Sequence, residues 1–493
     1  MNRTLDQLYI GGRWTGPASD ARLTVINPAT EEPVISVPEA TLADLDLSVA
    51  AARGALADGS WAAAGVVARV AVVEKAADLV AARADEIGLV MTEEMGAPLK
   101  GSVTGHVPAS VATMRELARM AGEIPEREIR AGRGPDALLL REPVGLVAAL
   151  TPWNGPFATA VNKAVAALLM GCPVICKPSP QTPLDVFYLA EALTQAGLPE
   201  GLFSILPATA EVSQALVAQP AVDAVSFTGS TGVGQRIGQL CGERFARVQL
   251  ELGGKSAAIV LDDADPQAVA GVLRGGVFRN AGQVCTALTR VVVPRSRYEE
   301  FTDALCAAAA AITVGDPLDP ATEMGPLATS DQRDRVERRI AQARVEGAGV
   351  AFGGGRPKGL DRGYYLEPTV LRDVTNDMYC AREEIFGPVA VVIPHDGDDD
   401  AIRIANDSAY GLHGAVFTAD GARALGVAAR VRTGTFSINS CVNNPTAPFG
   451  GVKASGIGRE HGPEGLEFFT ELKAVNLPAA LAAELRAAVA VAS

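Results

Sequence analysis

Short apolar runs alternate with longer amphipathic stretches along residues 145–260, and this alternation constrains the fold more than any other feature of the sequence. Strands separated by helices of this length are typical of βαβ units, in which the strands lie parallel in one sheet. The pattern predicts strands at residues 145–150, 173–177, 203–207, 221–227 and 247–252, and helices at residues 156–171, 182–196, 211–218 and 232–241. We therefore expect an α/β fold.

A second alternating block covers residues 257–439, with strands expected at residues 257–261, 290–293, 389–393, 414–418 and 435–439. The chain of 493 residues is too long for one ordinary hydrophobic core and indicates about two or three domains. A charged segment at residues 123–141 and the tail after residue 471 both contain strand-like runs. We expect these two segments to be arms that pair with a neighbouring subunit, with a frayed tail as the alternative.

Composition argues against several classes of protein. The net charge is −14 and no dense Lys/Arg run occurs, so a nucleic-acid partner is not expected. The polar start does not resemble a signal peptide, and no apolar stretch of about 18 residues lacks charges, so no membrane span is expected. The seven cysteines form no CxxC pair and the four histidines lie in no metal motif. This usage predicts a cytoplasmic protein without a metal site.

A glycine-rich turn follows one predicted strand, where residues 227–234 read FTGSTGVG. Glycines at the start of a helix let backbone N–H groups approach a phosphate. The turn matches neither the G-x-G-x-x-G fingerprint nor a P-loop. A pyrophosphate site and a plain tight turn therefore both remain open from this motif alone.

Three other residues are candidates for chemistry. Cys285 follows a Gly-Gln turn and is either a nucleophile or a small buried residue. Glu251 ends a predicted strand in an apolar setting, which favours a general base; the alternative is a carboxylate paired with Lys255. Asn154 lies at another strand end, where open α/β sheets bind ligands, and either holds an oxyanion or forms a turn.

Together these motifs resemble the aldehyde dehydrogenase family, and they keep the family's order over nearly the whole chain. The matching segments are TPWN at 151–154, KPS at 177–179, FTGS at 227–230, ELGGK at 251–255, GQVC at 282–285, EEIFGP at 383–388 and PFGGVKASG at 448–456. The resemblance implies a Rossmann-like dinucleotide-binding domain at residues 1–122 and 143–252, and an α/β catalytic domain at residues 253–456. It also implies a small β oligomerisation arm with the C-terminal tail at residues 123–142 and 457–493, and we expect a homotetramer.

The resemblance also implies the catalytic roles. Cys285 would attack the aldehyde to give a thiohemiacetal, and the amide of Asn154 with the backbone N–H of Cys285 would hold the oxyanion. After oxidation to a thioester, Glu251 would activate the water that hydrolyses it. Family members that pass the acyl group to coenzyme A generally lack this glutamate, so a free carboxylic acid is the implied product.

The implied cofactor is NAD, with NADP also usable. The residues that match the family's cofactor site are Trp153, Lys177, Ser179, Gly229, Ser230, Gly234, Leu252, Glu384 and Phe386. One position departs from the family, because Pro180 stands where a glutamate commonly binds the adenosine ribose. Proline neither holds the ribose hydroxyls nor repels a 2′-phosphate, so NADP is permitted.

The implied substrate tunnel has a small and partly polar lining: Ala158, Thr159, Asn162, Arg279, Val284, Thr286, Cys441, Asn443 and Phe449. It lacks the aromatic cage that favours a quaternary ammonium group, so medium-sized aliphatic, terpenoid or aromatic aldehydes are expected. Arg279 leaves open a succinate-semialdehyde-type substrate, because such enzymes carry an arginine at this distance before the cysteine. A noncatalytic binding or structural protein and a cysteine-dependent esterase are the competing classes.

Overall fold

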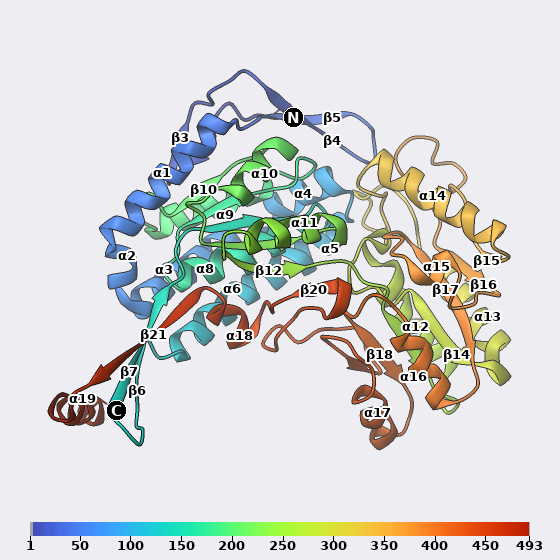
Figure 1. Ribbon diagram of the computed structural model, residues 1–493. Helices are drawn as coiled ribbons and strands as arrows, with labels where there is room; N and C mark the ends of the chain where they lie inside the picture. Colours follow the sequence, from blue (N-terminus) through green and yellow to red (C-terminus); the bar gives the residue numbers. More distant parts are fainter. Residues whose placement is uncertain (1–2, 493) are drawn as a thin grey trace.

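The computed structural model describes residues 3–492 and contains two large sheets flanked by helices (Figure 1). Residues 1, 2 and 493, which belong to the expected first domain and tail, lie outside the described residues. The first sheet has eight strands in the order β20-β12-β11-β8-β9-β10-β2-β3. Its parallel centre consists of β8 (Val147–Leu150), β9 (Val174–Lys177), β10 (Phe203–Ile205), β11 (Ala224–Thr228) and β12 (Arg247–Glu251).

The edges of the first sheet come from distant parts of the chain. β2 (Leu8–Ile10) and β3 (Arg13–Thr15) add antiparallel strands beside β10. β20 (Gly456–Ile457) pairs antiparallel with the end of β12. Each predicted strand of residues 145–252 is present, with its ends moved by a few residues. The predicted helix 182–196 begins later, as α9 (Asp185–Ala196), because Pro183 disfavours a helical conformation at Thr182.

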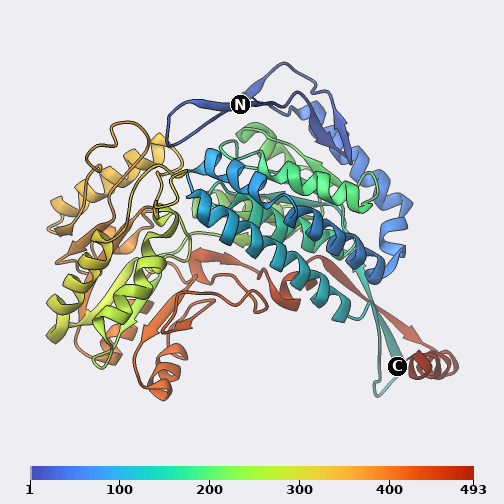
Figure 2. The same cartoon turned by 180° about the vertical axis from the view of Figure 1, so that it is seen from behind.

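Successive residues of β8 face opposite layers of helices, as the period of a strand requires. Val147 and Ala149 belong to a core shared with α3 (Gly65–Ala81), α6 (Val107–Glu123) and α9, which are visible from behind in Figure 2. Ala148 and Leu150 belong to a core shared with α1 (Leu42–Asp58), α10 (Ala210–Ala218) and α11 (Thr231–Gly242). Burial on both faces explains why these strands are continuous apolar runs.

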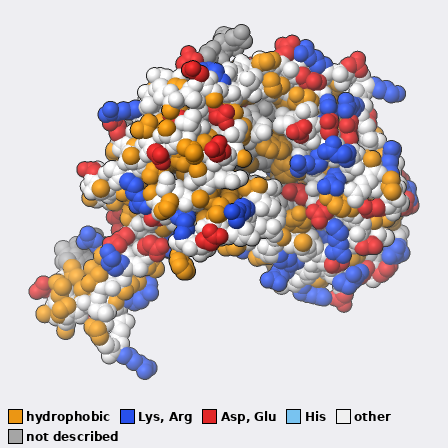
Figure 3. All heavy atoms as spheres, turned by 45° about the horizontal axis from the view of Figure 1, so that its top comes forward, with side chains coloured by type: hydrophobic (Ala, Val, Ile, Leu, Met, Phe, Trp, Pro, Cys, Tyr) orange, Lys and Arg blue, Asp and Glu red, His pale blue; other side chains and the backbone are white. Residues whose placement is uncertain are grey.

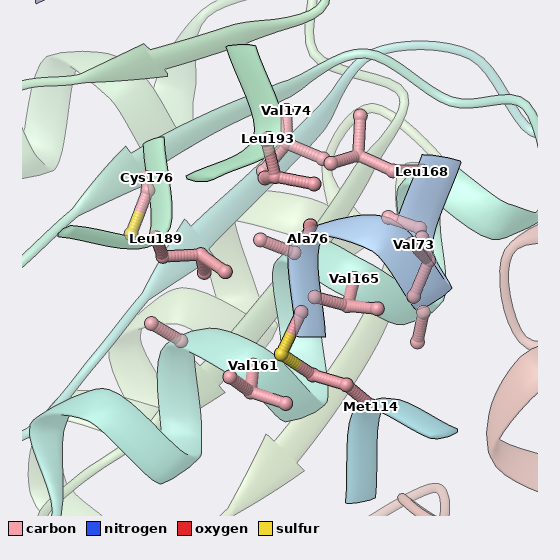
Figure 4. Packing of buried hydrophobic residues seen from close by; sticks show 14 of the residues in the cluster. Val73, Ala76, Met114, Val161, Val165, Leu168, Val174, Cys176, Leu189 and Leu193 are labelled. Carbon is pink, nitrogen blue, oxygen red and sulfur yellow. The ribbon is translucent and has the colours of Figure 1, made fainter. Parts of the chain in front are cut away.

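The helix between β8 and β9 is continuous but not uniform. It consists of α7 (Pro156–Ala160), a π-helical turn at Val161–Val165, and α8 (Ala166–Leu169). Val161 and Val165 point into the core among side chains of α3, α6, β9 and α9 (Figure 4). This packing fixes the helix that begins directly after Asn154.

The second sheet has seven strands in the order β15-β16-β17-β14-β13-β18-β19. The strands are β13 (Ala257–Val260), β14 (Arg290–Pro294), β15 (Gly349–Phe352), β16 (Thr369–Arg372), β17 (Val389–His395), β18 (Gly414–Phe417) and β19 (Ser437–Ile438). All neighbours are parallel except β15 and β16. Its helices include α12 (Pro266–Phe278), α13 (Tyr298–Ala310) and α14 (Ser330–Val345).

A separate three-stranded antiparallel sheet projects from the body of the molecule (Figure 1). It joins β6 (Arg127–Arg130), β7 (Asp136–Pro143) and β21 (Thr470–Leu477), so both predicted arm segments meet here. The C-terminal α19 (Ala479–Ala492) lies beside it and is tied to β7 by an ion pair between Arg486 and Asp136. No helix within residues 3–492 is long and apolar enough to cross a membrane.

Candidate active site

A cavity of about 310 Å³ brings the three predicted catalytic residues together. Asn154 follows β8, Glu251 ends β12, and Cys285 lies on the loop before β14. Six of the predicted cofactor residues line the same cavity: Trp153, Gly229, Ser230, Leu252, Glu384 and Phe386. Lys177, Ser179, Gly234 and the predicted tunnel residues lie outside this lining.

The loop that carries Cys285 has an unusual backbone. Asn280, Ala281 and Gly282 are consecutive left-handed residues, with φ of 53°, 52° and 70°. A Cβ atom at Gly282 would lie 2.0 Å from the carbonyl oxygen of Gly387, so only glycine fits there. Left-handed conformations at non-glycine residues cost about 1–3 kcal/mol each and persist only where the surroundings hold them. The loop is therefore held by close packing, which places Cys285 at the cavity.

Hydrogen bonds tie Asn154 to this loop. Its side-chain amide donates to the carbonyl oxygen of Gln283 at 2.9 Å. The amide of Asn280 donates in turn to the carbonyl oxygen of Asn154 at 3.0 Å. Because a side-chain amide has two N–H groups, the second one remains available for an oxyanion.

Glu251 is buried, with 3% of its surface exposed, and neither carboxylate oxygen has a hydrogen-bond partner among the described residues. Burial, reinforced by the negative charge of Glu460, raises its pKa well above the usual value, while Lys163 and Arg459 act in the opposite direction. The alternative pairing with Lys255 is wrong, because the Lys255 amine also has no partner there. Glu251 is thus a carboxylate with a raised pKa and free lone pairs, as a general base requires.

Two charged residues near Glu251 were not predicted. The amine of Lys163 pairs with the carboxylate of Glu460 and donates to the Ser226 hydroxyl at 3.0 Å. Lys163 and Glu460 are 297 residues apart in sequence, so their pairing is a product of tertiary structure. A lysine inside the apolar run of residues 160–169 was the available signal, because a buried charge needs a partner.

The Cys285 thiol is a weak acid in this setting. Burial, with the carboxylates of Glu384 and Glu251, raises its pKa to about 12. The thiol is therefore protonated at neutral pH and needs a base, or a positive charge bound beside it, to become a nucleophile.

Glu384 and Phe386 line the cavity as well. The Glu384 carboxylate accepts a hydrogen bond from the backbone N–H of Gly254 at 3.0 Å, and burial raises its pKa to about 7. The rings of Trp153 and Phe386 meet edge to face, with centroids 5.4 Å apart. A Cβ atom at Gly253 would lie 2.4 Å from Glu384 Oε2, so a side chain there would displace the Glu384 carboxylate.

The glycine-rich turn leads into α11, whose N-cap is Ser230. Gly229 and Ser230 line the cavity, so the free N–H groups of this helix start are close to it. Gly234 faces Leu252: a Cβ atom there would lie 2.4 Å from Leu252 Cδ2, so a side chain would displace Leu252. Lys177, at the end of β9, is buried and makes no ion pair among the described residues; burial lowers its pKa to about 8. Ser179 donates to the Gln181 side chain at 2.5 Å.

The predicted tunnel residues come from three segments of the chain. Ala158, Thr159 and Asn162 are partly exposed on the helix after Asn154, and Val284 and Thr286 flank Cys285. Arg279 is exposed and forms no hydrogen bond or ion pair within the described chain, although its charge acts on His106. Cys441, Asn443 and Phe449 are partly exposed, and the Phe449 ring lies 5.6 Å from the ring of His461. Across residues 3–492 no group of three or more His, Cys, Asp or Glu side chains is placed to hold a metal.

Comparison with known proteins decides the family. A sequence model described as the aldehyde dehydrogenase family matches residues 14–475. The chain belongs to the aldehyde dehydrogenase family. It is 42% identical to the geranial dehydrogenase of Castellaniella defragrans over 471 residues, covering 95% of this chain and 98% of that one. The resemblance and the aldehyde oxidoreductase activity class are thereby confirmed.

Solved structures agree with the fold of the enzyme. A Mycobacterium tuberculosis aldehyde dehydrogenase complexed with NAD+ matches with a TM-score of 0.95 and 45% identity, covering 97% of this chain and 99% of that one. Aldehyde dehydrogenase C from Pseudomonas syringae, complexed with NAD+ and octanal, matches with a TM-score of 0.94 and 38% identity, covering 97% and 99%. The predicted α/β fold class is therefore confirmed.

Proposed function

We propose that the enzyme oxidises an aldehyde to the free carboxylic acid with NAD, using Cys285, Glu251 and Asn154. The observation that carries the proposal is their convergence on one cavity, next to residues suited to a nicotinamide cofactor. A thiol, a buried carboxylate with free lone pairs and an amide with a spare N–H are the groups that acyl chemistry through a thioester needs.

The residues around the cavity fit an anionic dinucleotide. The start of α11 offers backbone N–H groups, and the Lys177 amine lacks a carboxylate partner, so both suit phosphate or ribose oxygens. Glu384 offers a carboxylate for ribose hydroxyls, and Phe386 offers an aromatic face. Bound here, the cofactor would supply the hydride acceptor. The M. tuberculosis and P. syringae relatives were solved with NAD+, which supports NAD as the cofactor.

In the first half-reaction, the Cys285 sulfur attacks the aldehyde carbon. Because the thiol pKa is raised to about 12, the proton must pass to a base as the bond forms. Glu251 lines the same cavity and has unpaired oxygens, so it is the candidate base. The Asn154 amide and the Cys285 backbone N–H hold the new oxyanion. The bound cofactor would accept the hydride whose loss leaves a thioester on Cys285.

Before the second half-reaction, Glu251 releases to solvent the proton that it took from the thiol. Glu251 then takes a proton from water, and the water oxygen attacks the thioester carbon. The carbon–sulfur bond breaks, the leaving thiolate takes the proton back from Glu251, and the carboxylic acid is released. The raised pKa of Glu251 suits this step, because a stronger base removes the proton of water more readily.

The expected substrates are medium-sized aliphatic, terpenoid or aromatic aldehydes. The relative named geranial dehydrogenase and the P. syringae structure with octanal support this class. A semialdehyde substrate is the second candidate, because Arg279 is exposed and unpaired beside the catalytic loop. A relative at 40% identity is named 3-succinoylsemialdehyde-pyridine dehydrogenase.

The projecting sheet supports self-association, and we propose a homotetramer. Leu472, Val475 and Leu481 on this arm are exposed, and Figure 3 shows apolar side chains gathered on the projection. A second copy would cover them and the open strand edges. The cysteine usage leads us to propose a cytoplasmic location. We also propose the division into a dinucleotide-binding domain, a catalytic domain and an oligomerisation arm that the family resemblance implies.

The test is reduction of NAD and NADP, followed by absorbance, with linear, terpenoid, aromatic, betaine and semialdehyde substrates. We expect reduction with one or more aldehydes and loss of it in Cys285→Ala, whereas Cys306→Ala, a half-buried cysteine of α13, keeps it. The acid product is identified by mass spectrometry. A folded protein that reduces neither cofactor with any aldehyde contradicts the proposal and favours the noncatalytic class. Ester hydrolysis without cofactor, as the sole activity, favours the esterase.

The cofactor preference is tested at Pro180. A carboxylate about 4 Å from a phosphate charge costs roughly 1–4 kcal/mol between bulk-water and surface dielectric values. Pro180→Glu is therefore expected to raise the KM for NADP about tenfold or more, with little change for NAD. An equal change in the KM for NAD and for NADP would show that residue 180 does not face the 2′ position of the adenosine ribose.

A further inference from the structure

Gly155, the residue after Asn154, differs from the other glycines near the catalytic residues. Cβ atoms at Gly253 and Gly254 would lie 2.4 Å from Glu384 Oε2 and 2.6 Å from the Cys285 carbonyl oxygen. At Gly155, φ is −164° and ψ is 56°, and no heavy atom lies within 4 Å of a Cβ position. Packing around the Cβ position does not require glycine there. Its missing side chain therefore leaves open space directly beside Asn154.

This space adjoins Asn154, which lines the catalytic cavity. The Asn154 amide donates to the carbonyl oxygen of Gln283, which is two residues before Cys285. An aldehyde whose carbon bonds to Cys285 and whose oxygen binds the Asn154 amide brings the substituents of its second carbon close to residue 155. Space at this position therefore acts on groups adjacent to the carbonyl, and not on the far end of a long chain.

The open side continues along the helix that follows. Pro156, Phe157 and Ala160 are buried, whereas Ala158, Thr159 and Asn162 are partly exposed. The helix cannot move inward, since Val161 and Val165 are packed in the core (Figure 4). The Thr159 hydroxyl already donates to the Gly155 carbonyl oxygen at 2.8 Å, so it is not free to bind a substrate as a donor.

Polarity changes farther along this side. Asn162 forms no side-chain hydrogen bond within the described chain. At 1.5 Å per residue, it lies about 10 Å along the helix from Gly155. The exposed side of this helix therefore begins with small side chains that have no free hydrogen-bond donor. Its first free side-chain amide, that of Asn162, comes about two turns later.

We propose that Gly155 determines specificity by admitting aldehydes that carry a branched or cyclic apolar group on the carbon next to the carbonyl. The inference rests on the proposed function, because it takes the carbonyl to be held between Cys285 and Asn154. A side chain at residue 155 would occupy the volume that such a group needs. A short linear aldehyde carries a single substituent on that carbon, which can turn away from residue 155, so its oxidation should not depend on the side chain there.

The test compares kcat/KM for propanal, isobutyraldehyde, pivaldehyde and cyclohexanecarbaldehyde. In the wild type we expect the branched and cyclic aldehydes to match propanal within about tenfold. Gly155→Leu is expected to lower kcat/KM for them by roughly 30-fold or more, and for propanal by no more than about threefold. Ala158→Leu narrows the same side one turn later and should penalise cyclohexanecarbaldehyde most, which keeps the test decisive if Gly155→Leu does not fold.

Gly54→Leu is the matched control, since Gly54 is an exposed helix glycine of α1 with no heavy atom within 4 Å of its Cβ position. It should leave the ratio between aldehydes unchanged. A wild type that oxidises propanal and not the branched aldehydes overturns the inference while leaving the proposed function intact. An equal loss for all four aldehydes in both folded leucine variants overturns it too. Failure of the wild type to oxidise any aldehyde, propanal included, defeats the proposed function and the inference with it.

Discussion

The two sides of the catalytic cavity are built in opposite ways. The side that carries Cys285 is close-packed: Gly282 meets Gly387, and Gly254 meets the Cys285 carbonyl oxygen, at distances that admit no Cβ atom. The side that begins at Gly155 has open space where a Cβ atom would stand. The difference indicates that the first side fixes the chemistry, whereas the second selects the substrate. Substitutions on the first side should slow the oxidation of every aldehyde by the same factor. Substitutions on the second side should alter the ratio of kcat/KM between aldehydes.

The largest effect is expected at Glu251, which acts on the chemistry alone. Glu251→Gln removes the base and should lower kcat about 10³- to 10⁴-fold, because general bases contribute at the upper end of that range when no other base replaces them. The loss should be equal for propanal and a branched aldehyde. Steady-state rates measure it, with Glu243→Gln, an exposed carboxylate of the same region, as the control. If Glu251→Gln lowered kcat for one of the two aldehydes only, the chemistry and the substrate selection would not be separated between the two sides of the cavity.

Asn154 is the point where the two sides meet, so its replacement sharpens the comparison. Asn154→Ala removes one oxyanion donor and should lower kcat about 10²- to 10³-fold for all aldehydes. The substitution also removes the hydrogen bond to the Gln283 carbonyl oxygen. Because close packing holds the catalytic loop without this bond, KM should rise only slightly. Asn444→Ala, an exposed asparagine, serves as the control. A large rise in KM with kcat unchanged would assign Asn154 to binding.

Much of this arrangement could be predicted from the sequence. The parallel strands were recognisable because burial on both faces makes them continuous apolar runs, and strand ends indicated Asn154 and Glu251 as candidates. The left-handed conformation of Ala281 was not predictable, since alanine has no preference for it and tertiary contacts impose it. The neighbourhood of Glu251 and Glu460 was equally hidden, because it depends on how β20 returns to the edge of β12.

Glycine-to-alanine changes at Gly282 and Gly155 compare the two sides directly. Gly282→Ala places a Cβ atom 2.0 Å from a backbone oxygen, in a conformation with φ of 70°. The loop must move, and a displacement of about 1 Å at the nucleophile costs on the order of 10²-fold in rate. Gly155→Ala meets no atom and should keep propanal oxidation within about twofold. Similar losses in the two variants, measured on folded proteins with propanal, would contradict the comparison.

The smallest effect is a shift in pH dependence, and it concerns how the fixed side tunes its base. Burial and the charge of Glu460 raise the pKa of Glu251, so activity should fall on acidification at a pH above the ordinary titration of a carboxyl group. Glu460→Gln removes a neighbouring negative charge and leaves Lys163 beside Glu251 without its partner. Both changes favour the ionised form of Glu251 and lower its pKa. The acid limb of the kcat profile should therefore move to lower pH. Glu464→Gln, an exposed carboxylate of the short helix α18 (Gly462–Glu467) that follows Glu460, should leave it in place. If the acid limb stays in place in Glu460→Gln, the step that limits kcat at low pH does not depend on the ionisation of Glu251. The catalytic base would then be another residue of the cavity. Glu384 would be the first alternative, because burial also raises its pKa, to about 7.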